Sequence, residues 1–361
     1  MKNRLTFLFA FLLLATITVN AQLNTPRGSQ MASVMQRVGT TDITITYSRP
    51  SVNDREIWGK LVPYGLTNLG FGTSKAAPWR AGANENTTIS FTHDVKIQGK
   101  AVAAGTYGLH LNVKDANNAT LILSTDKDAW GSYFYEPKND VLTADIVIAD
   151  NAFTELLTFS FDAVDKNSTT AALKWEKKAF PFKIEVDVTD IVLSDIRSQF
   201  KGQKGFSRQN WEQAANFALN NDGDLDEALQ WVNAALDGQF FSQKTFNGLA
   251  IKAQILQKKG DAEGFGTTMD EALGLANPGQ INRMGYAMIR AEDYDRAIKY
   301  FKTNVESDSK NANWHSSLAD GYKAKGDVKS AKKHYTKALS LNPNDRVKAS
   351  IEKGLKELNS K

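Results

Sequence analysis

Hydrophobic and polar residues alternate through much of the first half of the chain. Residues 43–47, Ile-Thr-Ile-Thr-Tyr, place an apolar side chain at every second position, and residues 183–187 repeat this pattern. A period of two is typical of strands with one buried face. Further short strands are predicted at residues 87–91, 106–113, 120–123, 141–148, 156–162 and 172–175.

Turn-forming residues separate these predicted strands, as at Gln98-Gly99-Lys100 and Ala104-Gly105. The gaps are too short for helical crossovers, so neighbouring strands should pair in antiparallel fashion. Several short strands without long helical segments between them are typical of a β-sandwich or an open barrel. We therefore expect an all-β, sandwich-like domain over residues 22–189.

Helical spacing replaces this alternation near residue 190 and continues to the end of the chain. A helix and the linker Lys-Gly-Gln-Lys-Gly account for residues 190–207. Residues 208–344 contain an internal repeat, and residues 345–361 form a charged amphipathic helix that could cap it. The predicted fold class is therefore α+β in separate domains, all-β in the N-terminal part and all-α in the C-terminal part.

The repeat is clearest in the unit that begins at Ala312. Three small residues allow its two helices to approach closely: Ala319, Ala331 and Ala338. Gly326-Asp327 supplies the turn between the helices. This unit resembles the tetratricopeptide repeat, whose period is about 34 residues. Units from about residues 209, 246 and 278 fit less well, and the unit from 246 has Phe265 where the repeat prefers a small side chain. The alternative is a helical bundle without a true repeat.

A stack of such repeats has a concave face lined by the first helix of each pair. The side chains predicted to line this protein-binding groove are Asn282, Tyr286, Arg290, Asn313, Ser316, Asp320 and Lys323. A polar groove of this kind suits an extended peptide or a chain terminus as its partner. Two alternatives stay open, since the stack could pack against its own β domain or self-associate into a homo-oligomer.

Residues 48–88 lack any period and are rich in Trp, Arg, Gly and Pro. Functional residues gather on loops, so this segment and the residues just after it are the candidate ligand site of the β domain. The candidate ligand-binding residues are Trp58, Trp79, Arg80, Asn84, Glu85, His93 and Asp94. The alternative is a structural loop in which the two tryptophans close the open end of the sandwich.

Two motifs in this region point to a known family. They are IWGKLVPYG at residues 57–65 and PWRAGANENTTISFTHDVKIQGKAVAAGTYGL at residues 78–109. In this order they resemble the bacterial family called domain of unknown function 2911, over about residues 22–188. The resemblance implies an exported protein of the type common in Bacteroidota, some of which carry tetratricopeptide repeats behind this domain. The family has no established activity, so it supplies no catalytic residues.

The N-terminus has the three parts of a secretory signal peptide over residues 1–21. Lys2 and Arg4 precede the uncharged run 5–19, and the pattern predicts cleavage after Ala21. The alternative is a membrane anchor, but spanning a bilayer takes about 20 apolar residues, and the run at residues 5–19 is shorter than that. We expect an exported protein, periplasmic or secreted, with no transmembrane segment after cleavage.

Composition excludes several kinds of chemistry. The chain has no cysteine, so thiol catalysis, cysteine–zinc sites and iron–sulfur clusters are absent. Its formal net charge of +4 does not indicate the concentrated basic face that nucleic-acid binding requires. His93, His110 and Glu85 do not have the spacing of a zinc site, and the S-x-x-K match at residues 124–127 lacks its partner motifs. No metal or cofactor is predicted.

The sequence therefore predicts an exported, non-catalytic binding or scaffold protein. Its β domain would recognise a ligand or surface, and its helical repeats would bind a protein or peptide. One alternative is an envelope hydrolase with a site near Arg80, Glu85 and His93, where an anion clamp and a general base could meet. A second alternative is a structural component of an envelope assembly.

Overall fold

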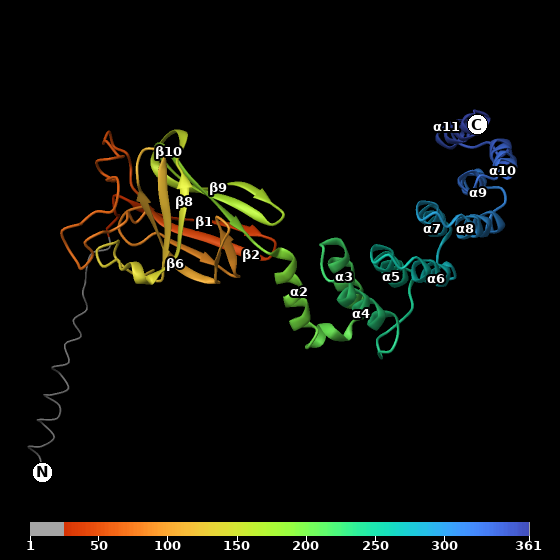
Figure 1. The fold of residues 1–361 in the computed structure, drawn as a ribbon, viewed down its shortest axis with the longest axis horizontal. Helices are drawn as coiled ribbons and strands as arrows, with labels where there is room; N and C mark the ends of the chain where they lie inside the picture. Colours follow the sequence, from red (N-terminus) through yellow and green to blue (C-terminus); the bar gives the residue numbers. More distant parts are fainter. Residues whose placement is uncertain (1–24, 361) are drawn as a thin grey trace, which may run out of the picture. The chain divides into compact units, whose positions relative to one another are not determined.

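The computed structural model describes residues 25–360 of the chain, so the predicted signal peptide at residues 1–21 lies outside the described residues. The chain divides after Val188 into two compact units (Figure 1). The first is built from strands and the second from helices, which confirms the predicted fold class. Between residues 25 and 360, no helix combines the length and the apolar character needed to cross a membrane.

Two antiparallel sheets form the first unit. The six-stranded sheet has the order β1-β2-β3-β6-β7-β8. Its strands are β1 (Gln30–Val38), β2 (Thr41–Arg49), β3 (Thr88–Phe91), β6 (Gly105–Val113), β7 (Asn118–Ser124) and β8 (Asp140–Val147). The four-stranded sheet has the order β5-β4-β10-β9. Its strands are β5 (Lys100–Val102), β4 (Val95–Ile97), β10 (Ser168–Glu185) and β9 (Ala149–Asp165).

The sheets face each other across an apolar core. Ile43, Ile45 and Tyr47 point inward from β2, as the alternation predicts, and the Tyr47 ring lies 4.8 Å from the ring of Phe159 on β9. Two strands were predicted where the single strand β10 runs. Glu176 adopts a positive φ of 53° and the register shifts on both sides of it, so the alternation changes phase within one strand.

Three strands escaped the sequence analysis. Strand β1 presents Met31 and Met35 to solvent and Val34 and Val38 to the core side, so apolar residues on both faces hide the period of two. Strands β4 and β5 have three residues each, which is too short for a periodic signal.

Strand pairing brings two long loops to the same end of the sandwich. Thr46 on β2 pairs with Thr88, Thr88 pairs with Gly108, and Gly108 pairs with Ser124 at the end of β7. The loop at residues 50–87 and the loop at residues 125–139, which includes the short helix η1 (Pro137–Asn139), therefore leave the sheet at one level (Figure 1).

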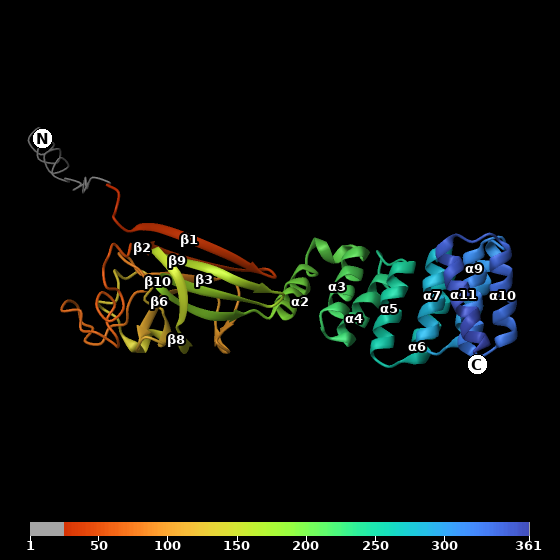
Figure 2. The same cartoon turned by 90° about the horizontal axis from the view of Figure 1, so that it is seen from above.

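The second unit is a stack of helix pairs preceded by α2 (Val188–Gln199) and η2 (Gln203–Phe206). The pairs are α3 (Arg208–Asn220) with α4 (Leu225–Leu236), α5 (Phe246–Lys258) with α6 (Ala262–Leu273), α7 (Pro278–Arg290) with α8 (Tyr294–Ser307), and α9 (Ala312–Lys325) with α10 (Val328–Ser340). Helix α11 (Asp345–Asn359) follows, packed on α9 and α10 (Figure 2).

Recurring local signals explain this stack. An aspartate caps the second helix of every pair by accepting backbone N–H bonds: Asp224, Asp261, Asp293 and Asp327. Small residues permit close packing, since a Cβ added at Gly285 on α7 would lie 2.4 Å from the Phe301 ring on α8. The unit from residue 246, which fits the repeat least well by sequence, still forms the helix pair of α5 and α6. Phe265 is buried within it.

Candidate functional site

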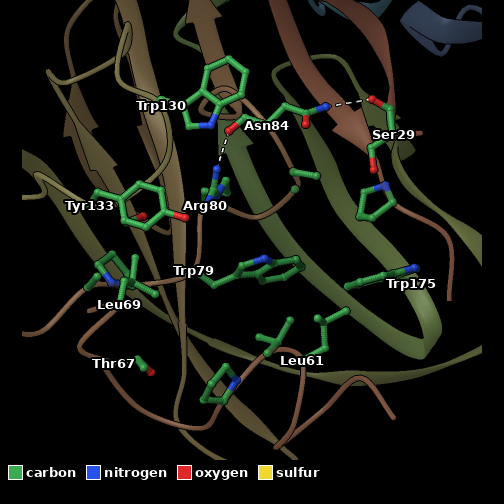
Figure 3. Close-up of a pocket in the computed structure, with 18 of the residues that line it drawn as sticks. Ser29, Leu61, Thr67, Leu69, Trp79, Arg80, Asn84, Trp130, Tyr133 and Trp175 are labelled. Carbon is green, nitrogen blue, oxygen red and sulfur yellow. Dashed lines mark hydrogen bonds between the residues drawn. The ribbon is translucent and has the colours of Figure 1, made fainter. Parts of the chain in front are cut away.

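A cavity of about 460 Å³ lies at the loop end of the β-sandwich. We call it cavity 1 (Figure 3). Most of its walls come from the loop at residues 50–87, with Ser29 ahead of β1, Trp130, Ser132 and Tyr133 from the loop at 125–139, and Trp175 from β10. The volume falls within the roughly 300–1,000 Å³ typical of small-molecule sites.

Two tryptophans, Trp79 and Trp175, line cavity 1 on the side of β10, and a third, Trp58, packs against both of them. The rings of Trp79 and Trp175 stack with centroids 5.9 Å apart and an interplanar angle of 18°. Trp58 meets both edge-on, at 6.0 and 6.1 Å, but does not itself line the cavity. Trp79 is held by two backbone hydrogen bonds to Leu111 on β6, at 2.9 and 2.8 Å, so this wall belongs to the rigid sheet.

Arg80 follows Trp79 and is the central polar group of cavity 1. Its guanidinium carbon lies 5.4 Å from the centre of the Tyr133 ring, and its Nη1 donates to the backbone carbonyl of Asn84. Gly131, at a φ of +78°, passes so close that an added Cβ would lie 2.3 Å from the guanidinium carbon. The chain thus holds this side chain from three sides.

The segment before β1 closes one side of the same region. Asn84 donates from Nδ2 to the backbone carbonyl of Ser29 at 2.9 Å, as Figure 3 shows. Arg27 forms an ion pair with Glu85 and lies over the Trp130 ring, 5.3 Å from its centre. The hydrogen bond from Arg27 lowers the pKa of Glu85, which lies beside cavity 1 rather than in its lining.

His93 and Asp94 lie elsewhere in the β domain. His93 Nδ1 is 3.1 Å from Thr41 Oγ1, and Asp94 accepts the backbone N–H of Ala104 at 2.7 Å. Strand β6 pairs with Phe91 at Gly105 and with Trp79 at Leu111, six residues further on. Six residues of extended chain span roughly 20 Å, so Arg80 and His93 do not converge on one site.

A second cavity, of about 380 Å³, lies on the other side of the 129–134 segment; we call it cavity 2. His110 on β6 lines it and is only 1% exposed, with its Nδ1 3.1 Å from Ser132 Oγ and its Nε2 buried without a partner. Burial lowers the pKa of His110 to about 4; the nearby carboxylate of Asp126 opposes this shift, and the charge of Arg80 adds to it. The imidazole is therefore neutral at pH 7. No group of three or more histidine or acidic side chains suited to a metal ion occurs in the described part of the chain.

The sequence analysis missed Trp130 and Tyr133, which line cavity 1 together with Arg80 and Asn84. Their segment, Trp-Gly-Ser-Tyr-Phe-Tyr at residues 130–135, is denser in aromatic residues than the loop that was selected. That density was the available signal. Trp175 had none, because it looks like any inward-facing residue of a strand.

In the helical unit, three of the predicted groove residues form bonds between repeats. Tyr286 on α7 donates to Asp320 on α9 at 2.7 Å, and Tyr335 on α10 donates to the same carboxylate. Lys323 on α9 pairs with Glu357 on α11 at 2.9 Å. Burial and Asp320 raise the pKa of Tyr286, which keeps the phenol a hydrogen-bond donor.

The other predicted groove residues differ in exposure. Arg290 and Asn313 are exposed, Asn282 is partly buried, and Ser316 is buried. The structure therefore leaves two of the predicted side chains fully open to a partner.

Comparison with known proteins finds a family model that matches part of each unit. Residues 29–184 match a family model described as protein of unknown function (DUF2911). The predicted family resemblance is thereby confirmed for this part of the chain. Residues 312–345 match the tetratricopeptide repeat, which confirms the unit that begins at Ala312. No curated protein matches the sequence.

Several solved structures are similar to the helical part of the chain. One is YrrB, described as a TPR protein with an unusual peptide-binding site, at 15% identity over 46% of this chain and 84% of that one, with a TM-score of 0.34. Another is MamA, at 13% identity over 43% and 89%, with a TM-score of 0.33. A third is the C-terminal part of a TPR repeat-containing protein from Cytophaga hutchinsonii, at 14% identity over 45% and 67%, with a TM-score of 0.34.

Proposed function

We propose that this protein is an exported binding protein in which the β domain holds a small ligand in cavity 1 and the helical repeats bind a second protein. Cavity 1 carries the proposal. It combines aromatic walls with a few fixed polar groups, Arg80, Asn84 and Ser29, which is the usual make-up of a ligand site. The proposal assigns no catalytic step, because Arg80, Glu85 and His93 do not converge.

The role of the helical unit rests on its repeats. Tetratricopeptide-like stacks present a groove that binds extended chain segments. Arg290 and Asn313, on the first helices α7 and α9, are exposed and suit a polar peptide or a chain terminus. Export rests on the predicted signal peptide, whose apolar segment is too short to favour a membrane anchor.

The ligand-binding role can be tested on the chain that begins at Gln22. A small-molecule library is screened by tryptophan fluorescence, and each hit is repeated with Trp130→Ala and with Phe153→Ala. Trp130 lines cavity 1 and is 54% exposed, while Phe153 on β9 is 57% exposed and does not line it. Binding weakened by Trp130→Ala alone supports the proposal, and hits that ignore Trp130 would argue against cavity 1.

The protein-binding role needs a separate test. Cross-linking in envelope extract compares the wild type with Arg290→Glu, in the proposed groove, and with Lys337→Glu, which is exposed on the second helix α10. Partners lost only in Arg290→Glu support groove binding. An identical partner list for all three proteins would refute binding through this groove. Export is tested by the N-terminal sequence of the protein recovered from the envelope fraction, where a mature start at Gln22 is expected.

A further inference from the structure

The charged side chains that line cavity 1 are all basic. They are Arg55 and Arg80, and no aspartate or glutamate lines the cavity. Three other cavities of the described chain each have acidic residues in their walls, such as Asp126 in cavity 2. Cavity 1 is thus set apart by an uncompensated positive charge, which favours an anionic occupant.

Arg80 itself lacks a charge partner. Two other partly buried arginines are paired with carboxylates: Arg208 with Glu212, and Arg296 with Asp270 and Asp293. A third, Arg49, donates to the Leu157 carbonyl and the Thr158 hydroxyl, so its donors are used within the fold. Arg80 is also partly buried, yet it forms no ion pair with any described residue, and its one hydrogen bond is to a backbone carbonyl. A guanidinium has five N–H donors in a fork that matches a carboxylate or a phosphate.

The position of Arg80 is prepared in advance. The Tyr133 ring, the Asn84 carbonyl and the side-chain-free backbone of Gly131 hold it at the cavity. A donor group fixed before binding loses little conformational entropy when its ligand arrives. An anion site needs a guanidinium that is fixed in this way. An arginine on the surface needs no such support, because solvent hydrates its charge.

The remaining walls indicate what carries the anion. The indole of Trp130 is 54% exposed, and Leu61 and Leu69 are 45% and 39% exposed, so apolar surface faces the opening. Ser29 and Thr67 supply polar groups among them (Figure 3). A sugar ring has the same mixed character, with an apolar C–H face that stacks on an indole and hydroxyls at its edge.

We infer that the occupant of cavity 1 is an anionic sugar, with its carboxylate on Arg80 and its ring against Trp130. This inference rests on the proposed ligand-binding role of the cavity. Arg55, which donates only to backbone carbonyls at 2.6 and 3.1 Å, adds positive charge at the rim. A phosphate on the sugar would use the same guanidinium fork.

The test uses two ligands that differ only in charge. D-glucuronate and D-glucuronamide are titrated into the chain that begins at Gln22, and heat is measured by calorimetry. We expect the acid to bind at least 10-fold more tightly than the amide, with a preference that weakens as salt is added. Glucose 1-phosphate, as a third ligand, distinguishes a carboxylate from a phosphate source of the anion. Equal affinities for acid and amide, or no binding of any anion, would overturn the inference.

Substitutions test whether Arg80 is the residue that binds the carboxylate of the ligand. Arg80→Gln should weaken glucuronate binding about 10- to 100-fold and leave glucuronamide nearly unchanged, since charged hydrogen bonds are the stronger ones. Arg37→Gln is the matched control, because Arg37 is an arginine of the same domain that pairs with Asp42 and does not line cavity 1. Loss of glucuronate binding in Arg37→Gln, or full binding in Arg80→Gln, would contradict the assignment.

Two further results separate a variant that fails to fold from a failure of the inference, and a failure of the inference from a failure of the proposed function. If Arg80→Gln fails to fold, Arg55→Gln removes an exposed charge at the same cavity, and the acid-to-amide preference should fall about 3-fold or more. An unchanged preference there would count against the inference. Neutral library compounds whose binding depends on Trp130 would leave the proposed function standing while the anionic sugar is rejected.

Discussion

The buried imidazole of His110 makes the β domain sensitive to acid. Burial is the main cause that lowers its pKa from 6.5 to about 4 in the folded protein; Arg80 acts in the same direction, and the carboxylate of Asp126 opposes them. The unfolded chain therefore binds more protons between pH 6.5 and 4, so the stability that the neutral imidazole provides is complete above pH 6.5 and is lost as the pH falls toward 4. One pKa unit corresponds to about 1.4 kcal/mol, which gives a loss of roughly 2–3 kcal/mol at pH 4.5.

Two measurements check this prediction. Proton–carbon NMR of the four histidine side chains gives each pKa directly, and the spectrum of His110→Gln assigns the missing signal. Urea unfolding at pH 7.5 and 4.5 gives the change in the free energy of unfolding. Over this interval the free energy of unfolding of His110→Gln should fall by roughly 2–3 kcal/mol less than that of the wild type. His93→Gln serves as the control, because His93 is less buried and contacts Thr41 at its Nδ1.

The reasoning has a clear point of failure. A pKa near 6.5 for His110 would mean that water or the carboxylate of Asp126 stabilises the charged imidazole enough to offset its burial. An equal loss of stability in wild type and His110→Gln would place the acid sensitivity in other groups, such as the carboxylates.

Three further substitutions test packing and the linkage between repeats by urea unfolding. Gly131→Ala places a side chain at a φ of +78° and against Arg80, so the free energy of unfolding should fall by roughly 1–3 kcal/mol and glucuronate binding should weaken; Gly28→Ala, with nothing within 4 Å, is the control. Gly285→Ala drives a Cβ into the Phe301 ring and should cost roughly 1–3 kcal/mol, while Gly279→Ala in the same helix should be neutral or stabilising by up to about 1 kcal/mol. Asp320→Ala removes the acceptor of both Tyr286 and Tyr335 and should cost about 2–3 kcal/mol, in contrast to Glu306→Ala on the exposed face of α8. Losses of similar size in each variant and its control would refute the contact that the pair tests.

The helical unit was largely readable because its signals are local. The caps at Asp293 and Asp327 and the alanines at 297 and 331 lie within one or two turns of the helices that they define. Helices α7 and α9 therefore begin at Pro278 and Ala312, where the repeat units were predicted to start. Local signals do not predict the hydrogen bond from Tyr286 to Asp320, because this bond depends on the angle between successive repeats.

Cavity 1 was readable only in part because it is assembled by strand pairing. Trp79, Arg80 and Asn84 share one loop, and their composition marked them. Trp130 joins them only because the end of β7 lies level with the start of β3, through the pairs Thr88–Gly108 and Gly108–Ser124. The same extended strands carry His93 away, although it follows Arg80 by only 13 residues. His93 was therefore wrongly predicted to share a site with Arg80, because it is close to Arg80 in sequence but not in space.

The two cavities are joined electrostatically through Arg80 and His110. The positive charge of Arg80 adds to burial in lowering the pKa of His110, while the carboxylate of Asp126 raises it. Arg80→Gln removes that charge, so the pKa of His110 should rise, yet it should stay below 6.5 because burial is the larger cause. An anion bound to Arg80 offsets the same charge, so saturating glucuronate should move the His110 signal in the same direction in the wild type. By reciprocity, the affinity for the anion should increase when His110 is protonated. An unchanged or lower pKa in Arg80→Gln, measured on the same NMR signal, would show that the guanidinium charge does not reach the imidazole.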